Sequence, residues 1–136
     1  IMVNVMLMGG ENSMVQIIGR GLADATGSYW TMFASYLGAV GAFFSGSNTV
    51  SNLTFGAVQY SVANTTGLSI PLILALQSVG GAMGNMVCIN NIIAVCSVLG
   101  IDRAEGKILK VTAVPMFVYG IIAAVVALLV IPLIFS

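Results

Sequence analysis

Residues 45–52 read Ser-Gly-Ser-Asn-Thr-Val-Ser-Asn, and residues 77–85 read Gln-Ser-Val-Gly-Gly-Ala-Met-Gly-Asn. These two polar segments interrupt an apolar region, because the sequence has no Asp, Glu, Lys, Arg or His between Ala25 and Ile101. A helix that faces lipid has no use for clustered hydroxyls, amides and glycines. Irregular polar backbone occurs at membrane depth only where protein buries it or where it lines a cavity. The first polar segment (45–52) and the second polar segment (77–85) therefore predict the core of a membrane transporter.

The composition supports an integral membrane protein. Of the 136 residues, 59% are hydrophobic and 6% are charged, whereas roughly a quarter of the residues of a soluble domain are charged. A soluble domain of this length exposes much of its surface and could not hide such a sequence. The composition predicts an all-α, multi-pass protein of the plasma membrane, in contact with the lipid bilayer. The net charge is zero and no basic run is present, which argues against a nucleic-acid partner.

The N-terminal region predicts one incomplete span and one short helix. Residues 1–8 are apolar but lack the pattern of a signal peptide, so we expect them to end a span that begins in an upstream part of the same transporter. Residues 13–24 predict a helix capped by Ser13. This helix is too short to cross a bilayer of about 30 Å and is expected to lie at the interface. Tyr29 and Trp30 would suit the same depth.

Residues 31–63 predict a re-entrant helical hairpin. Two apolar stretches of about 14 residues, each roughly 21 Å long as a helix, flank the first polar segment. One continuous helix would expose the hydroxyls and amides of that segment around most of its circumference. A hairpin that enters and leaves on one side of the membrane avoids this, and Ser-Gly-Ser-Asn is suitable turn chemistry. One long span buried by neighbouring helices is the alternative.

Residues 70–101 predict a broken helix, since a continuous helix of this length would be about 48 Å long, too long for one untilted span. The expected break is at residues 80–85, which leaves half-helices on both sides. Gly80 and Gly84 are also spaced as a small-xxx-small pair, so a plain helix-packing face is the alternative. Cys88 and Cys96 follow in apolar surroundings and are expected to be buried.

The C-terminal region predicts a charged loop and a last span. Residues 102–110 hold Arg103, Lys107 and Lys110, and short basic loops stay on the cytoplasmic side. We expect residues 111–135 to form the last transmembrane helix. The whole chain, 1–136, is thus expected to be the C-terminal part of a membrane domain, belonging to one half of an inverted-repeat transporter.

The polar residues offer binding chemistry rather than catalysis. The sequence has no base for a serine nucleophile, no His-containing metal cluster and no phosphate-binding loop, so we expect neither an enzyme nor a cofactor. The N-termini of half-helices suit a carboxylate, and unwound carbonyls suit a small cation such as Na⁺. The predicted substrate-binding residues are the polar and glycine positions of the two segments: Ser47, Asn48, Thr49, Ser51, Asn52, Gly80, Gly81 and Asn85.

The same residues carry a resemblance to a known family. Residues 41–52, Gly-Ala-Phe-Phe-Ser-Gly-Ser-Asn-Thr-Val-Ser-Asn, with Gln59 and with Gly-Gly-Ala-Met-Gly-Asn-Met at 80–86, resemble the L-lactate permease family. The resemblance implies a secondary carrier of a short 2-hydroxy monocarboxylate, lactate or glycolate, generally coupled to H⁺. Residues 47–49, Ser-Asn-Thr, are similar to hairpin tips of the wider ion-transporter superfamily. That superfamily combines a re-entrant hairpin with a broken helix, and its dicarboxylate members use Na⁺.

Two departures from the family pattern bear on the coupling ion. Asn85 stands where these permeases commonly have Lys, and residues 89–91, Ile-Asn-Asn, stand where they have Ser-Pro-Gln. Without the Lys charge, a carboxylate would depend on N–H donors, helix dipoles and a co-bound cation. Three alternatives stay open: H⁺ coupling, Na⁺ coupling, or a structural membrane subunit that does not transport.

Overall fold

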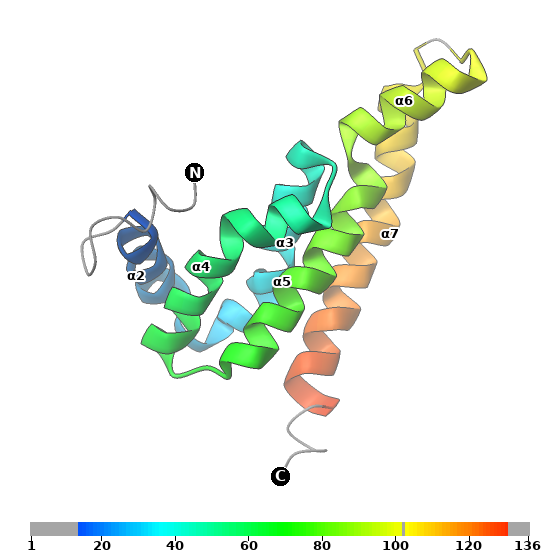
Figure 1. Ribbon diagram of the computed structural model, residues 1–136. Helices are drawn as coiled ribbons and strands as arrows, with labels where there is room; N and C mark the ends of the chain where they lie inside the picture. The colour runs from blue at the N-terminus through cyan, green and yellow to red at the C-terminus, as the bar shows by residue number, and fades with distance from the viewer. Residues whose placement is uncertain (1–13, 102, 131–136) are drawn as a thin grey trace.

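The computed structural model describes residues 14–101 and 103–130, which form helices joined by short turns (Figure 1). The predicted all-α class is confirmed. The predictions for residues 1–8 and 131–135 lie outside the described residues. The elements in order are α2 (Met14–Thr26), η2 (Gly27–Tyr29), α3 (Trp30–Ser45), α4 (Asn48–Thr66), α5 (Ile70–Gly84), η3 (Asn85–Val87), α6 (Ile89–Leu99), α7 (Glu105–Val125) and a π-helical turn, η4 (Val126–Val130).

The chain reverses at the first polar segment. Helix α3 ends at Gly46, which has a φ of 70° and a backbone N–H that donates to the Ala42 carbonyl, a left-handed conformation that favours glycine. Ser47 then caps α4, because its side-chain oxygen accepts from the Val50 N–H at 3.3 Å. The two helices pack against each other, so the alternative of one continuous helix is wrong. That the hairpin is re-entrant in a membrane stays a prediction.

The second polar segment does not break the helix where the sequence suggested. Gly80 and Gly81 lie inside α5, and the interruption comes later, at residues 85–88. There a single 3₁₀ turn is followed by Cys88 in an extended conformation, with φ −62° and ψ 121°. The predicted break at residues 80–85 is therefore wrong in position. Figure 1 shows α6 turning away from the axis of α5 after this interruption.

The glycines of α5 serve a close contact with α3. A Cβ atom at Gly80 would overlap the carbonyl oxygen of Ser35, and one at Gly84 would overlap that of Ala39. Only residues without a side chain allow two helix backbones to approach so closely. The small-xxx-small interpretation of these glycines accounts for why α5 continues through them. Backbone atoms of α3 occupy the space that a Cβ atom at Gly80 or Gly84 would need.

Two long apolar stretches complete the fold. Ile70–Leu99 and Glu105–Leu129 are 30 and 25 residues long, and by length and composition each could cross a membrane. Helix α7 begins before the predicted residue 111, since residues 100–104 suffice for the turn after α6. It packs beside α3, where the Tyr36 hydroxyl donates to the Phe117 carbonyl at 3.0 Å. Most of its large side chains are exposed, as expected for a surface that meets lipid or other helices.

Two further predictions concern individual side chains. Cys88 and Cys96 are buried free cysteines, with 0% and 2% of their surface exposed, which confirms their prediction. Trp30 was expected at a membrane interface, but it is only 3% exposed. Its indole N–H donates to the side-chain oxygen of Gln59 at 2.7 Å. A buried amide on α4 thus satisfies its one polar atom, and the membrane depth of Trp30 stays a prediction.

Candidate functional site

Polar side chains of α4 face α5 near the hairpin turn. Asn48 and Asn52 are one helical turn apart and therefore share a face of α4. The Asn52 side-chain amide is 3.4 Å from the Ser78 hydroxyl. The Asn48 side-chain oxygen lies against Gly81, where a Cβ atom would overlap it. The structure thus brings Asn48, Asn52 and Gly81, three of the predicted site residues, to one helix contact.

Three buried asparagine oxygens, two on α4 and one just after α5, have no hydrogen-bond donor among the described residues. The Oδ1 atoms of Asn48, Asn52 and Asn85 are buried and accept no hydrogen bond within the described part of the chain. Leaving a buried acceptor without a donor costs about 1–3 kcal/mol. Native proteins rarely accept that cost without a reason such as a ligand or an ion. Each of the three oxygens is therefore a candidate contact for a polar solute or an ion.

The hairpin turn meets the interruption of the second long helix. A Cβ atom at Gly46 would lie 3.2 Å from the Cys88 sulfur and 3.4 Å from the Asn91 side-chain oxygen. Ser47 and Cys88 are the N-caps of α4 and α6, so two helix N-termini lie close together. Helix N-termini present unpaired N–H groups and the positive end of the helix dipole. Cys88 caps no N–H with its side chain, which leaves the first N–H groups of α6 available.

A small cavity opens beside this meeting point. Its volume is about 200 Å³, below the roughly 300–1,000 Å³ of pockets for drug-sized ligands. Polar and apolar side chains share its lining, which consists of Asn85, Met86, Asn91, Ile92, Val95 and Ile108. A cavity with two amides at one side and aliphatic walls suits a small, partly polar solute.

Four other predicted residues have different surroundings. Ser47 is a helix cap, and Thr49 is exposed on α4. Ser51 is 1% exposed, and its hydroxyl already donates to the Gly38 carbonyl at 2.7 Å. Gly80 faces α3 rather than α4. The structure does not bring Ser51 or Gly80 to the face that carries Asn48 and Asn52.

Residues that the sequence analysis did not select also belong to this region. Asn91 lines the cavity, and Ser78 contacts Asn52. Ser78 lies within the second polar segment, so its polarity was a usable signal. The sequence marks Asn91 only as part of residues 89–91, which depart from the family pattern. Its place beside Gly46 depends on the interruption at residues 85–88, which no local pattern fixed.

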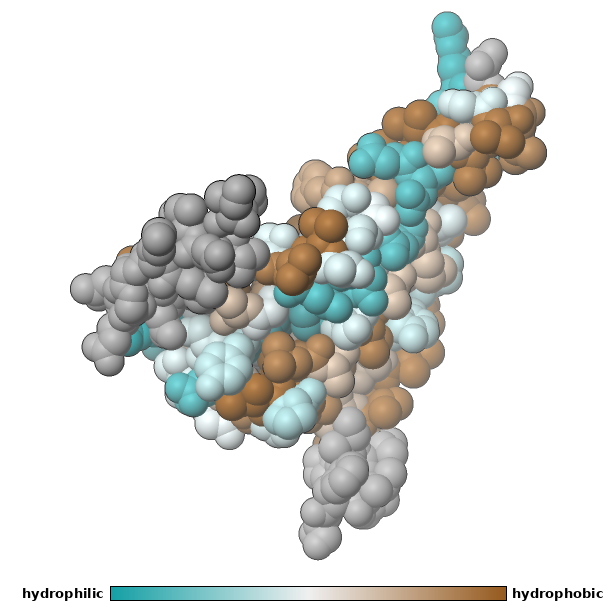
Figure 2. Space-filling view, viewed as in Figure 1, coloured by the Kyte–Doolittle hydropathy of each residue, from teal (hydrophilic) through white to brown (hydrophobic). Residues whose placement is uncertain are grey.

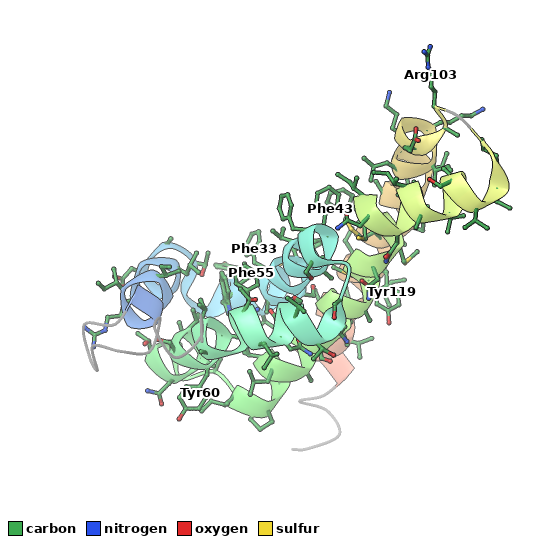
Figure 3. All side chains as sticks on the ribbon, turned by 45° about the horizontal axis from the view of Figure 1, so that its top comes forward. Phe33, Phe43, Phe55, Tyr60, Arg103 and Tyr119 are labelled. Atoms are coloured by element: carbon green, nitrogen blue, oxygen red, sulfur yellow. The ribbon has the colours of Figure 1, made fainter. Side chains whose placement is uncertain are left out.

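On the surface of the molecule, too, polar residues gather along the contact of α4 with α5. Figure 2 shows a hydrophilic band over the contact of α4 with α5 and on toward α6, with hydrophobic surface on both sides. In Figure 3, Phe33 lies on α3, where it is 51% exposed, whereas Phe55 of α4 packs against Gly41 of α3. Long apolar helices, exposed apolar faces and uncharged polar groups between the helices are typical of a membrane-embedded protein.

Comparisons with known proteins identify the family. Residues 1–134 match the sequence model of the family described as L-lactate permease, and the chain belongs to this family. The relatives are named permeases, which are transporters rather than enzymes, and the prediction of the family is confirmed. No solved structure matches the chain significantly.

The relatives are considerably longer than this chain. A protein of Haemophilus influenzae named "Putative L-lactate permease" is 67% identical over 136 residues, which are all of this chain and 26% of that protein. The L-lactate permease of Escherichia coli is 32% identical over 76% of this chain and 19% of its own length. A glycolate permease of the same species is 29% identical over the same shares. The chain thus spans about a quarter or less of these relatives.

Proposed function

We propose that this chain contributes the substrate site of a secondary carrier for lactate or glycolate. One observation carries the proposal: the N-termini of α4 and α6 meet at Gly46, beside a cavity lined by Asn85 and Asn91. A carboxylate is stabilised at helix N-termini. The amides can pair with the 2-hydroxyl group, and the aliphatic wall suits a methyl group. The names of the relatives, lactate and glycolate permeases, agree with a substrate of this size.

We propose H⁺ as the coupling ion. The resemblance to lactate permeases favours it, although no acidic residue or histidine occurs between Ala25 and Ile101. The proton acceptor would then belong to the upstream part of the transporter. Na⁺ is the second candidate, because three unpaired amide oxygens are the kind of ligand that hard cations take.

Uptake into proteoliposomes that hold the full-length transporter tests both points. We expect saturable uptake of labelled lactate, competition by glycolate, and little competition by succinate, which carries a second charge. A pH gradient should drive uptake several times above the level without a gradient, and a Na⁺ gradient should not. Absence of saturable lactate and glycolate uptake would contradict the proposed function. Uptake driven by Na⁺ alone would replace H⁺ with the second candidate.

The proposed orientation places the loop between α6 and α7 in the cytoplasm. Arg103 projects from this loop, away from the rest of the structure (Figure 3), and Lys107 and Lys110 follow in the first turns of α7. Short basic segments beside membrane helices stay inside. A cysteine placed at Arg103 should react with an impermeant maleimide in inverted membrane vesicles and not in intact cells. Labelling in intact cells would contradict the orientation.

A further inference from the structure

A directed chain of hydrogen bonds joins α3, α4 and α5. The Trp30 indole N–H donates to the Gln59 side-chain oxygen at 2.7 Å, and the Gln59 amide donates to the Gln77 oxygen at 2.8 Å. The Gln77 amide donates to the Ser51 hydroxyl at 3.0 Å, which donates to the Gly38 carbonyl at 2.7 Å. All four side chains are at most 3% exposed. These hydrogen bonds lie entirely in the interior of the hairpin and in its contact with α5.

The ends of this chain fix the direction of every bond in it. An indole N–H can only donate and a backbone carbonyl can only accept. The oxygen of Gln59 must therefore face Trp30, and each following amide is oriented in turn. The second amide hydrogen of Gln59 goes to the Ala34 carbonyl at 2.8 Å. Both glutamine amides use all their donors, so the network holds its partners rather than a solute.

The network is directly adjacent to the candidate site. Ser51 lies between Asn48 and Asn52 in α4, and Gln77 precedes Ser78, the partner of Asn52, in α5. The bond from Gln77 to Ser51 thus spans the same two helix turns that carry the site. It sets the register of α4 on α5, and with it the separation of the polar groups on the two helices.

We infer that Gln77, oriented by Gln59, is a positioning residue of the carrier: it fixes α4 against α5 so that the N-terminus of α4, with Asn48, keeps its place beside the substrate cavity. The inference rests on the proposed function. Neither glutamine has a free amide hydrogen for the substrate, because both amides donate within the network. A well-placed hydrogen bond in a low-dielectric interior limits motion more strongly than one in water, so the hairpin and α5 should move as one body.

Gln77→Met in the full-length transporter is the principal test, because Met keeps most of the volume and removes every hydrogen bond. We expect KM for labelled lactate to rise about tenfold. We expect kcat, calculated per folded molecule, to fall by less than about threefold. A role in folding alone would lower the amount of folded protein and leave KM unchanged. Asn64→Ala is the control, since it removes an exposed amide from α4, the helix that Gln77 contacts, and it should leave both constants unchanged.

A second measurement does not depend on the substrate. Cysteines placed at Asn52 and Ser78, whose side chains are 3.4 Å apart, should cross-link rapidly under mild oxidation. The rate should fall severalfold when Gln77→Met is added. If Gln77→Met does not reach the membrane, Gln59→Met is the substitute. It should slow cross-linking and raise KM by smaller factors, because the hydrogen bond from Gln77 to Ser51 stays in place.

The outcomes separate the inference from the function on which it rests. Slower cross-linking together with a raised KM supports the positioning role. Unchanged cross-linking overturns it, whatever happens to KM. If the wild-type transporter moves neither lactate nor glycolate, the proposed function fails, and the cross-linking rate alone decides whether Gln77 positions the two helices.

Discussion

Gly80→Val will separate α3 from α5 and remove nearly all transport. The added Cβ would occupy the position of the Ser35 carbonyl oxygen, and a helix backbone cannot rotate away as a flexible side chain can. Overpacking of a core contact typically costs about 1–3 kcal/mol, and a clash with a backbone atom falls at the upper end, a large share of the stability of a typical protein. We expect at least a severalfold loss of monodisperse protein after detergent extraction, measured by fluorescence size-exclusion chromatography.

Gly56→Ala is the matched control for this prediction. Gly56 lies in α4, and a Cβ atom there would meet nothing within 4 Å among the described residues. Alanine also raises helix propensity by about 1 kcal/mol relative to glycine. The control should therefore extract as well as the wild type. Normal yield and normal uptake for Gly80→Val would show that α3 and α5 are not in close contact.

Asn48→Asp will abolish uptake while leaving the protein in the membrane. The new carboxylate would stand at the N-terminus of α4, the place proposed for the substrate carboxylate. Two like charges about 4 Å apart repel by about 4 kcal/mol at an effective dielectric constant near 20. We expect initial uptake of labelled lactate to fall by roughly 100-fold or more. Asn48→Ala should fall less, by roughly tenfold, because it removes an amide without adding a charge.

Helix-capping chemistry makes the aspartate variant informative. A negative charge in the first turn of a helix is favourable for the helix itself, so Asn48→Asp should not disturb α4. Asn64→Asp, at an exposed position near the other end of α4, controls for the added charge and should transport normally. Wild-type uptake in the Asn48→Asp variant would remove Asn48 from the substrate site.

The sequence predicted the turn between α3 and α4 because its signals are local. Ser47 is a preferred N-cap, and Gly46 can adopt the left-handed conformation that ends α3. Asn48, Asn52 and Asn85 could be selected for a related reason: amides without charged neighbours in an apolar region need partners.

The tertiary contacts were beyond local reasoning. Whether Gly80 breaks a helix or packs against another depends on Ser35, which is far away in sequence. The pairing of Gln59 with Gln77 and the approach of Asn91 to Gly46 depend in the same way on how the helices meet. Polar residues in an apolar region indicate that partners exist, but only the packing of helices determines which partners they are.

The central claim is that a short 2-hydroxy monocarboxylate binds where the hairpin turn meets the interruption after α5. A cysteine at Met86, a partly exposed wall of the cavity, tests it in the full-length transporter with Cys88 and Cys96 replaced by alanine. Saturating lactate or glycolate should slow the reaction of this cysteine with maleimide at least severalfold, and succinate should not. A cysteine at Arg103 should react at the same rate with or without substrate. An unchanged rate at Met86, in a variant that still takes up lactate, would contradict the account.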